Sequence, residues 1–243
     1  MCSDLQPTTY YLQSNSMKPN IAILSFPGNN GDTENLRTFW RNGMDAFVFR
    51  WNDDREKLTN VTGYFIGAGF SYEDRGRAGM VAARDPLFQF LHEESAAGKV
   101  IIGHCNGCQM LVESELIPLD SGLQMCMAQN MAHDYAAGFL NEWVWITPTC
   151  APDRCAASDW EGAIHIPIAH GEGRFVTKDP DLIRELQAND QVAFCYCNAT
   201  GTVQTEAPYC PNGSTLGIAG ICNPAGNVVA MMPHAERTAN GDP

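Results

Sequence analysis

A cysteine set between two glycines is the first residue in this sequence whose surroundings suggest chemistry. Cys105 follows the apolar run at residues 100–102 and lies between Gly103 and Gly107. The pattern predicts a strand, a tight turn and a helix, which together form a nucleophile elbow. The positive end of that helix would face the sulfur and favour the thiolate, which is the attacking species. The backbone N–H of Asn106 would also face the oxyanion that forms when Cys105 attacks a carbonyl.

A histidine and a glutamate near the end of the sequence could supply the base that a thiol nucleophile needs. His234 and Glu236 follow an apolar run and are two positions apart, so an extended segment would turn both side chains to one side. We expect His234 to take the proton from Cys105 and to return it to the leaving group, while Glu236 orients the imidazole. His170 is a weaker candidate base, and His104 is expected to point to the opposite side of its strand.

The residues alone leave two other interpretations of the cysteine open. Most cysteines are small buried apolar residues, and Cys105 with Cys108 could form a redox or metal-binding pair. A zinc site would need a second pair at suitable spacing, which the other cysteines do not supply. A catalytic thiol is the favoured interpretation, and a non-catalytic thiol or metal-binding protein is the alternative.

Composition narrows the class of protein. The chain has 243 residues, of which 44% are hydrophobic, enough for one large α/β domain with a filled core. Its formal net charge of −13 disfavours binding to nucleic acid or to an anionic membrane. No apolar run has the length of a membrane span, and we expect no signal peptide. The ten cysteines are irregularly spaced, which favours a reduced, cytoplasmic protein over a disulfide scaffold.

The elements that must position these residues alternate between strand and helix in the first half of the chain. Strands are predicted at residues 20–26, 45–50, 63–68 and 100–102, and helices at 32–42, 80–98 and 106–115. Asp32 is expected to cap the first helix, and Pro86 to interrupt the second. This alternation predicts a doubly wound, mostly parallel sheet with flanking helices, which binds ligands at the carboxyl ends of its strands.

The second half predicts a few antiparallel edge strands. Alternating or apolar runs indicate strands at residues 141–147, 163–169, 191–197, 216–222 and 228–232. Pro167 places its strand at an edge or a bulge, and residues 170–174 are expected to form a glycine-rich polar loop. Asp179 and Pro180 begin a helix that runs to about residue 189. We expect residues 1–17 to be a flexible extension, with Met17 as a possible start, and residues 18–240 to form a single domain.

Several segments together resemble a known family. They are residues 26–30, 69–72, 77–79, 103–109, 166–173 and 231–236. In this order they are similar to triad-type class I glutamine amidotransferase domains, and most of all to members that serve as separate glutaminase subunits in purine biosynthesis. The resemblance covers about residues 18–238 and implies a flavodoxin-like fold.

The resemblance implies a role for each candidate residue. Cys105 would attack the side-chain amide of glutamine and form a thioester, with His234 as acid and base and Glu236 as its orienting group. The residues implied to bind the oxyanion and the substrate are Gly69, Phe70, Asn106, Gln109, His170 and Gly171.

Three positions depart from the pattern of the family. Residues 67–69 read Gly-Ala-Gly where the family usually has Pro-Gly-Gly, which leaves the oxyanion donor open. His104 stands where an apolar residue is usual, and Ala235 stands where a proline is usual.

The resemblance also implies a division of labour. The sequence has no Walker loop, so ammonia would pass to a larger ATP-dependent synthase subunit, often accompanied by a small third subunit. That subunit would bind ATP and Mg²⁺ and convert formylglycinamide ribonucleotide to the amidine. No cofactor or metal is expected in this chain, and glutamine is the expected substrate. An elbow-cysteine hydrolase of another kind, such as a γ-glutamyl peptidase, is the alternative enzyme.

Overall fold

The computed structural model describes residues 18–119, 122–132, 135–136 and 138–238. The predicted flexible extension at residues 1–17 lies outside this described part. Within it, no helix combines the length and the apolar character that crossing a membrane requires.

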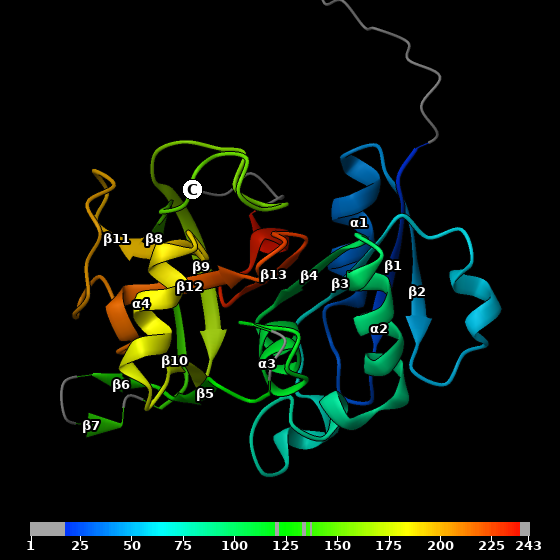
Figure 1. Ribbon diagram of the computed structural model, residues 1–243, viewed down its shortest axis with the longest axis horizontal. Helices are drawn as coiled ribbons and strands as arrows, with labels where there is room; N and C mark the ends of the chain where they lie inside the picture. Colours follow the sequence, from blue (N-terminus) through cyan, green and yellow to red (C-terminus); the bar gives the residue numbers. More distant parts are fainter. Residues whose placement is uncertain (1–17, 120–121, 133–134, 137, 239–243) are drawn as a thin grey trace, which may run out of the picture.

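Five parallel strands form one half of a nine-stranded sheet in the described chain (Figure 1). In spatial order they are β2 (Asp45–Arg50), β1 (Asn20–Ser25), β3 (Gly63–Ile66), β4 (Val100–His104) and β13 (Val228–Met231). Buried apolar residues lie in β1, β3, β4 and β13, as expected for parallel strands that helices cover on both faces, whereas in β2 at the edge only Phe49 is buried. The predicted doubly wound parallel arrangement is therefore confirmed, and the first three strands begin at the predicted residues.

Four antiparallel strands complete the sheet. The order continues from β13 with β12 (Ile218–Cys222), β11 (Val192–Cys197), β8 (Leu140–Pro148) and β9 (Ile164–His170). β8 pairs with strands on both sides, so the strand predicted at residues 141–147 is antiparallel and interior. Pro167 lies in β9 at the end of this order, where its missing N–H leaves no ladder hydrogen bond unmade.

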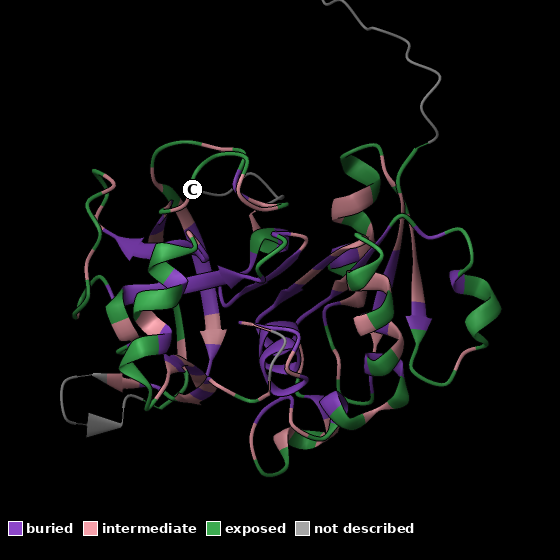
Figure 2. Ribbon diagram, in the orientation of Figure 1, coloured by how far each residue is buried: buried purple, intermediate pink, exposed green. Residues whose placement is uncertain are grey.

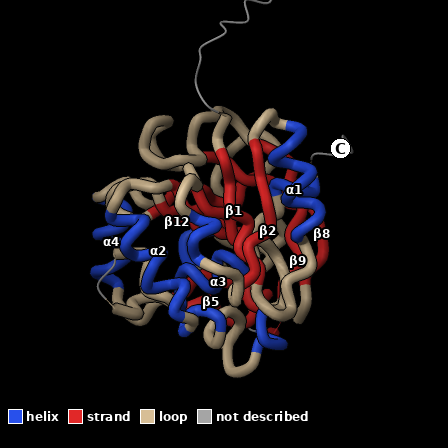
Figure 3. Tube along the Cα trace, turned by 90° about the vertical axis from the view of Figure 1, so that its right-hand side faces the viewer, coloured by secondary structure: helices blue, strands red, loops and turns tan. Residues whose placement is uncertain are grey.

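Helices cover both faces of the sheet. α1 (Asp32–Arg41) lies on one side of the strand layer, while α2 (Pro86–Ala96) and α4 (Pro180–Ala188) lie on the other (Figure 3). α3 (Asn106–Glu113) packs against β3, β4 and β13, and all of its residues are buried (Figure 2). This burial fixes the direction of α3 and therefore the position of its N-terminus at the end of β4.

Helix starts follow the local sequence in one case and depart from it in another. α4 begins at Pro180 as predicted, because the Asp179 carboxylate accepts a hydrogen bond from the N–H of Asp181 at 2.9 Å. The prediction that Asp32 caps the first helix is wrong. Asp32 is itself the first helical residue, and its Oδ2 accepts a hydrogen bond from the Ser25 hydroxyl at 2.7 Å. That bond ties α1 to the end of β1.

Single 3₁₀ turns connect several elements. They are η1 (Arg55–Leu58), η2 (Ser71–Asp74), η3 (Ala82–Arg84), η4 (Thr215–Gly217) and η5 (Ala235–Arg237). The interruption predicted at Pro86 is confirmed, because η3 ends at Arg84 and α2 begins at Pro86.

Two short ribbons lie beside the main sheet. The sequence predicts a polar loop at residues 170–174, but β10 (Glu172–Val176) begins there and pairs with β5 (Cys126–Gln129). Only Gly171 separates β9 from β10, and Phe175 is fully buried in the ribbon. The loop prediction is therefore wrong, because burial of alternate side chains outweighs the glycine content. The second ribbon pairs β6 (Met131–Ala132) with β7 (Tyr135–Ala136).

Candidate active site

Cys105 lies at the turn between β4 and α3, where the sequence predicts a nucleophile elbow. Its φ of 51° and ψ of −112° place the backbone in a region that non-glycine residues rarely adopt. The neighbouring glycines make this turn possible. A Cβ at Gly107 would lie 2.0 Å from the carbonyl oxygen of Ile66, and one at Gly103 would lie 2.6 Å from that of Gly107. The sulfur therefore stands at the N-terminal end of α3, above the carboxyl end of the sheet.

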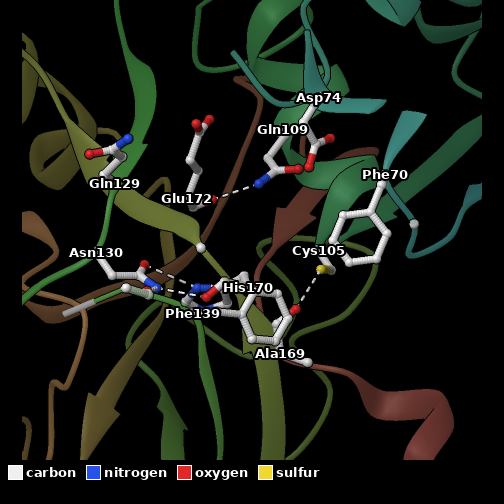
Figure 4. Close-up of a pocket in the computed structure, with 13 residues that line it drawn as sticks. Phe70, Asp74, Cys105, Gln109, Gln129, Asn130, Phe139, Ala169, His170 and Glu172 are labelled. Atoms are coloured by element: carbon white, nitrogen blue, oxygen red, sulfur yellow. Dashed lines mark hydrogen bonds between the residues drawn. The ribbon is translucent and has the colours of Figure 1, made fainter. Parts of the chain in front are cut away.

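The Cys105 thiol is hydrogen-bonded to the backbone in this structure. Its Sγ donates to the carbonyl oxygen of Ala169 at 3.5 Å (Figure 4). Cys108, one helical turn further along α3, is fully buried, and burial raises the pKa of its thiol well above the ordinary value. Both cysteines are free thiols. Cys105 is therefore the better placed of the two to act as a nucleophile.

His234 and Glu236 form a buried hydrogen-bonded pair just beyond β13. The prediction of an extended segment is wrong here, because the chain turns into η5 directly after His234. The turn still brings the two side chains together, with His234 Nδ1 2.7 Å from Glu236 Oε1. Both side chains are almost completely buried. His234 Nε2 has no hydrogen bond to the described residues, which leaves it available to the thiol.

The charges around this pair favour an imidazolium beside a carboxylate. Burial alone would lower the pKa of His234, but attraction to the Cys105 thiolate and to Glu236 outweighs burial and raises it to about 9. Burial alone would raise the pKa of Glu236, but His104 and His234 lower it to about 2. Glu236 is therefore ionised at neutral pH, and His234 can hold the proton that it takes from Cys105.

His104 contacts the proposed triad, so the prediction that it stands apart on the opposite side of its strand is wrong. Its Nδ1 lies 3.1 Å from Glu236 Oε2. Its ring centroid lies 4.5 Å from that of Phe65 and 5.6 Å from that of His234. The prediction assumed that side chains of successive strand residues point to opposite faces of the sheet. That alternation ends with β4 at His104, because the positive φ of Cys105 begins the turn.

Two backbone N–H groups beside the thiol make no hydrogen bond to the described residues, namely those of Gly69 and Asn106. Asn106 is the first residue of α3, where the N–H groups of the first turn have no partner within the helix. Phe70, which the resemblance also implicates, donates its N–H to the carbonyl oxygen of Gly28 at 3.0 Å. Gly69 and Asn106 are thus the available oxyanion donors.

A cavity of about 330 Å³ lies over the thiol (Figure 4). It is lined by Gly69, Phe70, Asp74, Cys105, Gln109, Gln129, Asn130, Gly138, Phe139, Ala169, His170, Gly171 and Glu172. Gln109 lies between the side chains of Asp74 and Glu172. Burial and the charge of Glu172 raise the pKa of Asp74 to about 6. The rings of Phe70 and Phe139 stack 6.4 Å apart and stay half-exposed, so the cavity combines a polar end with an aromatic edge.

Side chains of the first turn of α3 are bonded into the walls of this cavity. Gln109 Nε2 donates to the carbonyl oxygen of Glu172 at 2.6 Å, and its Oε1 accepts from Asn106 Nδ2 at 2.8 Å. Asn106 Oδ1 in turn accepts from the N–H of Ser71 at 3.0 Å. Gln109 therefore lines the cavity as the resemblance implies, while the Asn106 side chain holds Gln109 and the loop after β3 in place.

His170 shapes the cavity from the end of β9. Asn130 Nδ2 donates to the carbonyl oxygen of His170 at 2.7 Å, and Asn130 Oδ1 lies 3.1 Å from His170 Nδ1. Burial and the neighbouring His234 lower the pKa of His170 to about 3, so its ring is neutral at pH 7. Gly173 leaves room for this ring, since a Cβ there would lie about 2 Å from it. Of the two candidate bases, only His234 is paired with a carboxylate.

Several residues of the site could not be selected from the sequence. Asn130 and Phe139 lie in a stretch without a clear pattern, and no signal in one sequence distinguishes them. Glu172 lies inside the glycine-rich segment at residues 170–174, and Asp74 follows shortly after the segment at residues 69–72, so the nearness of both to these segments was the signal available. His104 was expected to point away from the site and was otherwise noticed as a departure from the family.

One group in the described chain has the donor set of a metal site. His104, His234 and Glu236 bring one ligand atom each to within 4.8 Å of one another. Because the carboxylate lies between the two imidazoles and already accepts a hydrogen bond from His234, an orienting network accounts for these contacts. That this chain binds no metal or cofactor stays a prediction.

Comparisons with known proteins agree with this geometry. A family model described as a CobB/CobQ-like glutamine amidotransferase domain matches residues 18–242. The chain is 43% identical over 224 residues to the phosphoribosylformylglycinamidine synthase subunit PurQ of Methanothrix thermoacetophila, covering 89% of this chain and 86% of that protein. It is 33% identical over 221 residues to the protein of the same name from Pyrococcus horikoshii, with coverage of 90% and 89%.

A solved structure is similar over the same length. The chain matches a structure titled as that of PurLQS from Thermotoga maritima with a TM-score of 0.72 and 29% sequence identity. The match covers 92% of this chain and 90% of that chain. The similarity in sequence and in fold therefore spans most of each protein.

Proposed function

The chain belongs to the CobB/CobQ-like glutamine amidotransferase family, and from that premise we propose that it is the glutaminase subunit of phosphoribosylformylglycinamidine synthase. In this role it hydrolyses glutamine and passes the ammonia to a synthase subunit in purine biosynthesis. One observation carries the proposal. An elbow cysteine opens into a cavity lined by amide and carboxylate groups, and it lies beside a buried histidine–glutamate pair.

The cavity suits the two ends of a glutamine molecule. Asp74 and Glu172 form a negative end, and the raised pKa of Asp74 reflects its burial and the charge of Glu172. The α-ammonium group of glutamine would relieve this repulsion. At the other end, Cys105 meets the side-chain amide, with Gln109 between the two ends. The cavity thus favours a ligand that carries an ammonium group at one end and an amide at the other.

The first half of the reaction forms the thioester. The Cys105 thiol turns from Ala169 toward His234, gives its proton to Nε2, and the sulfur attacks the side-chain carbonyl carbon of glutamine. The N–H groups of Gly69 and Asn106 stabilise the oxyanion, and one such donor contributes about 10²–10³-fold to the rate. His234 then protonates the leaving nitrogen and ammonia departs.

The second half releases glutamate. His234 removes a proton from an incoming water molecule, which attacks the thioester carbon. The same two N–H groups stabilise the second oxyanion, and its collapse releases glutamate and restores the thiol with the proton held by His234. Glu236 stays ionised throughout and keeps Nδ1 of His234 as a hydrogen-bond donor.

The ammonia would be used by a separate protein. We propose that a large synthase subunit binds ATP and Mg²⁺, accepts the ammonia and converts formylglycinamide ribonucleotide to formylglycinamidine ribonucleotide, with a small subunit completing the complex. The structure of PurLQS from Thermotoga maritima supports such an assembly. We also propose that the chain acts in the cytoplasm, where this biosynthetic reaction would find its substrates.

Turnover of glutamine by the assembled complex tests the proposal. The chain would be co-expressed with the synthase and small subunits of its host, and glutamate formation measured from glutamine and from a γ-glutamyl dipeptide. We expect turnover of glutamine only. Cys105→Ala should abolish it, whereas Cys108→Ala, a matched change one helical turn further along, should retain it. Equal turnover of the dipeptide would favour a γ-glutamyl peptidase, and metal binding without any turnover would favour a non-catalytic protein.

A further inference from the structure

The two oxygens of the Glu236 carboxylate have different neighbours. Oε1 accepts the hydrogen bond from His234 at 2.7 Å and lies 3.6 Å from Arg237 Nε. Oε2 lies 3.1 Å from His104 Nδ1, and no other contact of this oxygen with a side chain is seen in the described chain. The His104–Oε2 pair has the distance of a hydrogen bond without its alignment, so Oε2 is a buried acceptor whose nearest side-chain donor is His104.

His104 is held in place by the strand that carries the nucleophile. It is the last residue of β4, directly before Cys105, and pairs in register with Met231 of β13. Its side chain is 2% exposed, and its ring meets the ring of Phe65 edge to face. These contacts leave the imidazole little freedom to turn away from Glu236.

His104 can serve this carboxylate as a neutral donor. The charged and titratable groups that face it are Glu236, His234 and Arg237. Burial lowers the pKa of His104 to about 4 despite the attraction of Glu236, so the ring carries a single N–H at neutral pH. With that proton on Nδ1, His104 donates to Oε2 without cancelling the charge that Glu236 directs at His234.

We propose that His104 is a positioning residue, which holds the second oxygen of Glu236 so that the first stays on His234. The inference deepens the proposed glutaminase function and rests on it for its kinetic test. The carboxylate otherwise has one aligned hydrogen bond from a side chain, and a buried carboxylate held at one oxygen can swing about that bond. Holding both oxygens fixes the plane of the carboxylate and with it the direction of the His234 ring.

Two substitutions of His104 separate positioning from packing. The amide nitrogen of asparagine can occupy the place of Nδ1, so His104→Asn keeps a donor for Glu236. His104→Leu restores apolar volume against Phe65 but removes the donor. In the assembled complex, we expect His104→Asn to keep most of kcat and His104→Leu to lose about tenfold or more, with little change in KM, since one hydrogen bond to a charged group is lost. A packing role predicts the reverse order, and that result would overturn the proposal.

An NMR measurement tests whether His104 donates to Glu236 without depending on enzyme activity. Long-range ¹H–¹⁵N spectra of the histidine rings in the free subunit at pH 7 should show His104 neutral with its proton on Nδ1, assigned from its loss in His104→Asn. A proton on Nε2, or a charged ring, would overturn the proposal even if both variants fold poorly. If the wild-type complex fails to turn over glutamine while His104 shows the expected tautomer, the proposed function fails and the contact with Glu236 stands.

Discussion

Cys105 lies far in the sequence from the other two residues of the proposed triad, His234 and Glu236, yet the sequence was enough to select all three. Cys105 stands out because glycines flank it after an apolar run, and His234 and Glu236 because they share a spacing behind another apolar run. The sequence could not predict that His104 reaches Glu236. That contact depends on where β4 ends and on how β13 lies beside it, which no local pattern encodes.

Alanine substitutions of the base and of its orienting group should differ in severity. His234→Ala removes the proton acceptor and should reduce glutamine turnover by the complex to the background. Glu236→Ala keeps the base but no longer fixes the orientation of its imidazole ring, so a measurable fraction of the activity should remain. His165→Ala is a matched control, because that ring packs against Trp145 and is not among the residues that line the cavity. If His170→Ala lost its activity while His234→Ala kept full activity, the assignment of His234 as the base would be contradicted.

Strands that are marked by apolar runs in the sequence were predicted well. Elements that depend on pairing with a distant strand, or that are a single turn long, were not. The strands at residues 20, 45 and 63 begin where short apolar runs begin. β10 was missed because its identity as a strand comes from pairing with β5, more than forty residues earlier in the chain. η5 was missed because a single helical turn has too few residues to show a period.

An ion pair that ties the segment before η3 to the end of α3 gives a prediction about stability. Arg77 makes two hydrogen bonds of 2.8 Å to Glu113, whose side chain is 1% exposed, whereas that of Arg77 is 42% exposed. Arg77→Met leaves a buried carboxylate without its partner and should reduce the free energy of unfolding by about 2–4 kcal/mol. Glu113→Gln leaves a guanidinium that can reach water, and should cost about 1 kcal/mol.

Urea unfolding of the two variants at pH 7 measures this difference. The order of the two effects is the informative result, because both variants break the same ion pair. A larger loss for Glu113→Gln than for Arg77→Met would contradict the role given to burial of the carboxylate.

Buried histidines should make the stability of the whole molecule depend on pH. The pKa of His104 is lowered to about 4 and that of His170 to about 3, so below pH 6.5 the unfolded chain binds protons that the folded chain excludes. Their contribution is complete above pH 6.5 and is lost as the pH falls toward these folded values. Asp74, with its raised pKa of about 6, titrates in the opposite sense and offsets part of the loss.

Comparing the wild type with His104→Asn isolates the contribution of His104 to the pH dependence of stability. Between pH 6 and 4.5 the wild-type free energy of unfolding should fall more steeply with acidity, by up to about 1.4 kcal/mol per pH unit for one proton. Urea unfolding at several pH values measures both slopes, and the titratable groups that do not interact with His104 cancel in the difference. Parallel slopes would show that His104 is not a buried neutral group.

The subunit alone should be a poor glutaminase, because its chain generates ammonia without a place to use it. In the isolated chain the Cys105 thiol donates a hydrogen bond to the carbonyl oxygen of Ala169. The peptide between Ala68 and Gly69 is held by one long hydrogen bond, 3.3 Å from Asn30 N to Ala68 O. Both contacts are weak enough for a docked partner to shift. We expect glutaminase turnover to rise by about 10² or more in the complex with nucleotide and ribonucleotide bound, equivalent to one oxyanion donor. Equal rates would contradict this gating and leave the family assignment unaffected.

The fate of the glutamine amide nitrogen tests the whole account most directly. The assembled complex would be given glutamine labelled with ¹⁵N in the amide, unlabelled ammonium, ATP, Mg²⁺ and formylglycinamide ribonucleotide, and the amidine analysed by mass spectrometry. We predict that the wild-type complex places ¹⁵N in the amidine, and that the Cys105→Ala complex forms only unlabelled amidine from ammonium. Undiminished ¹⁵N incorporation by the Cys105→Ala complex, or no incorporation by the wild-type complex, would contradict the account.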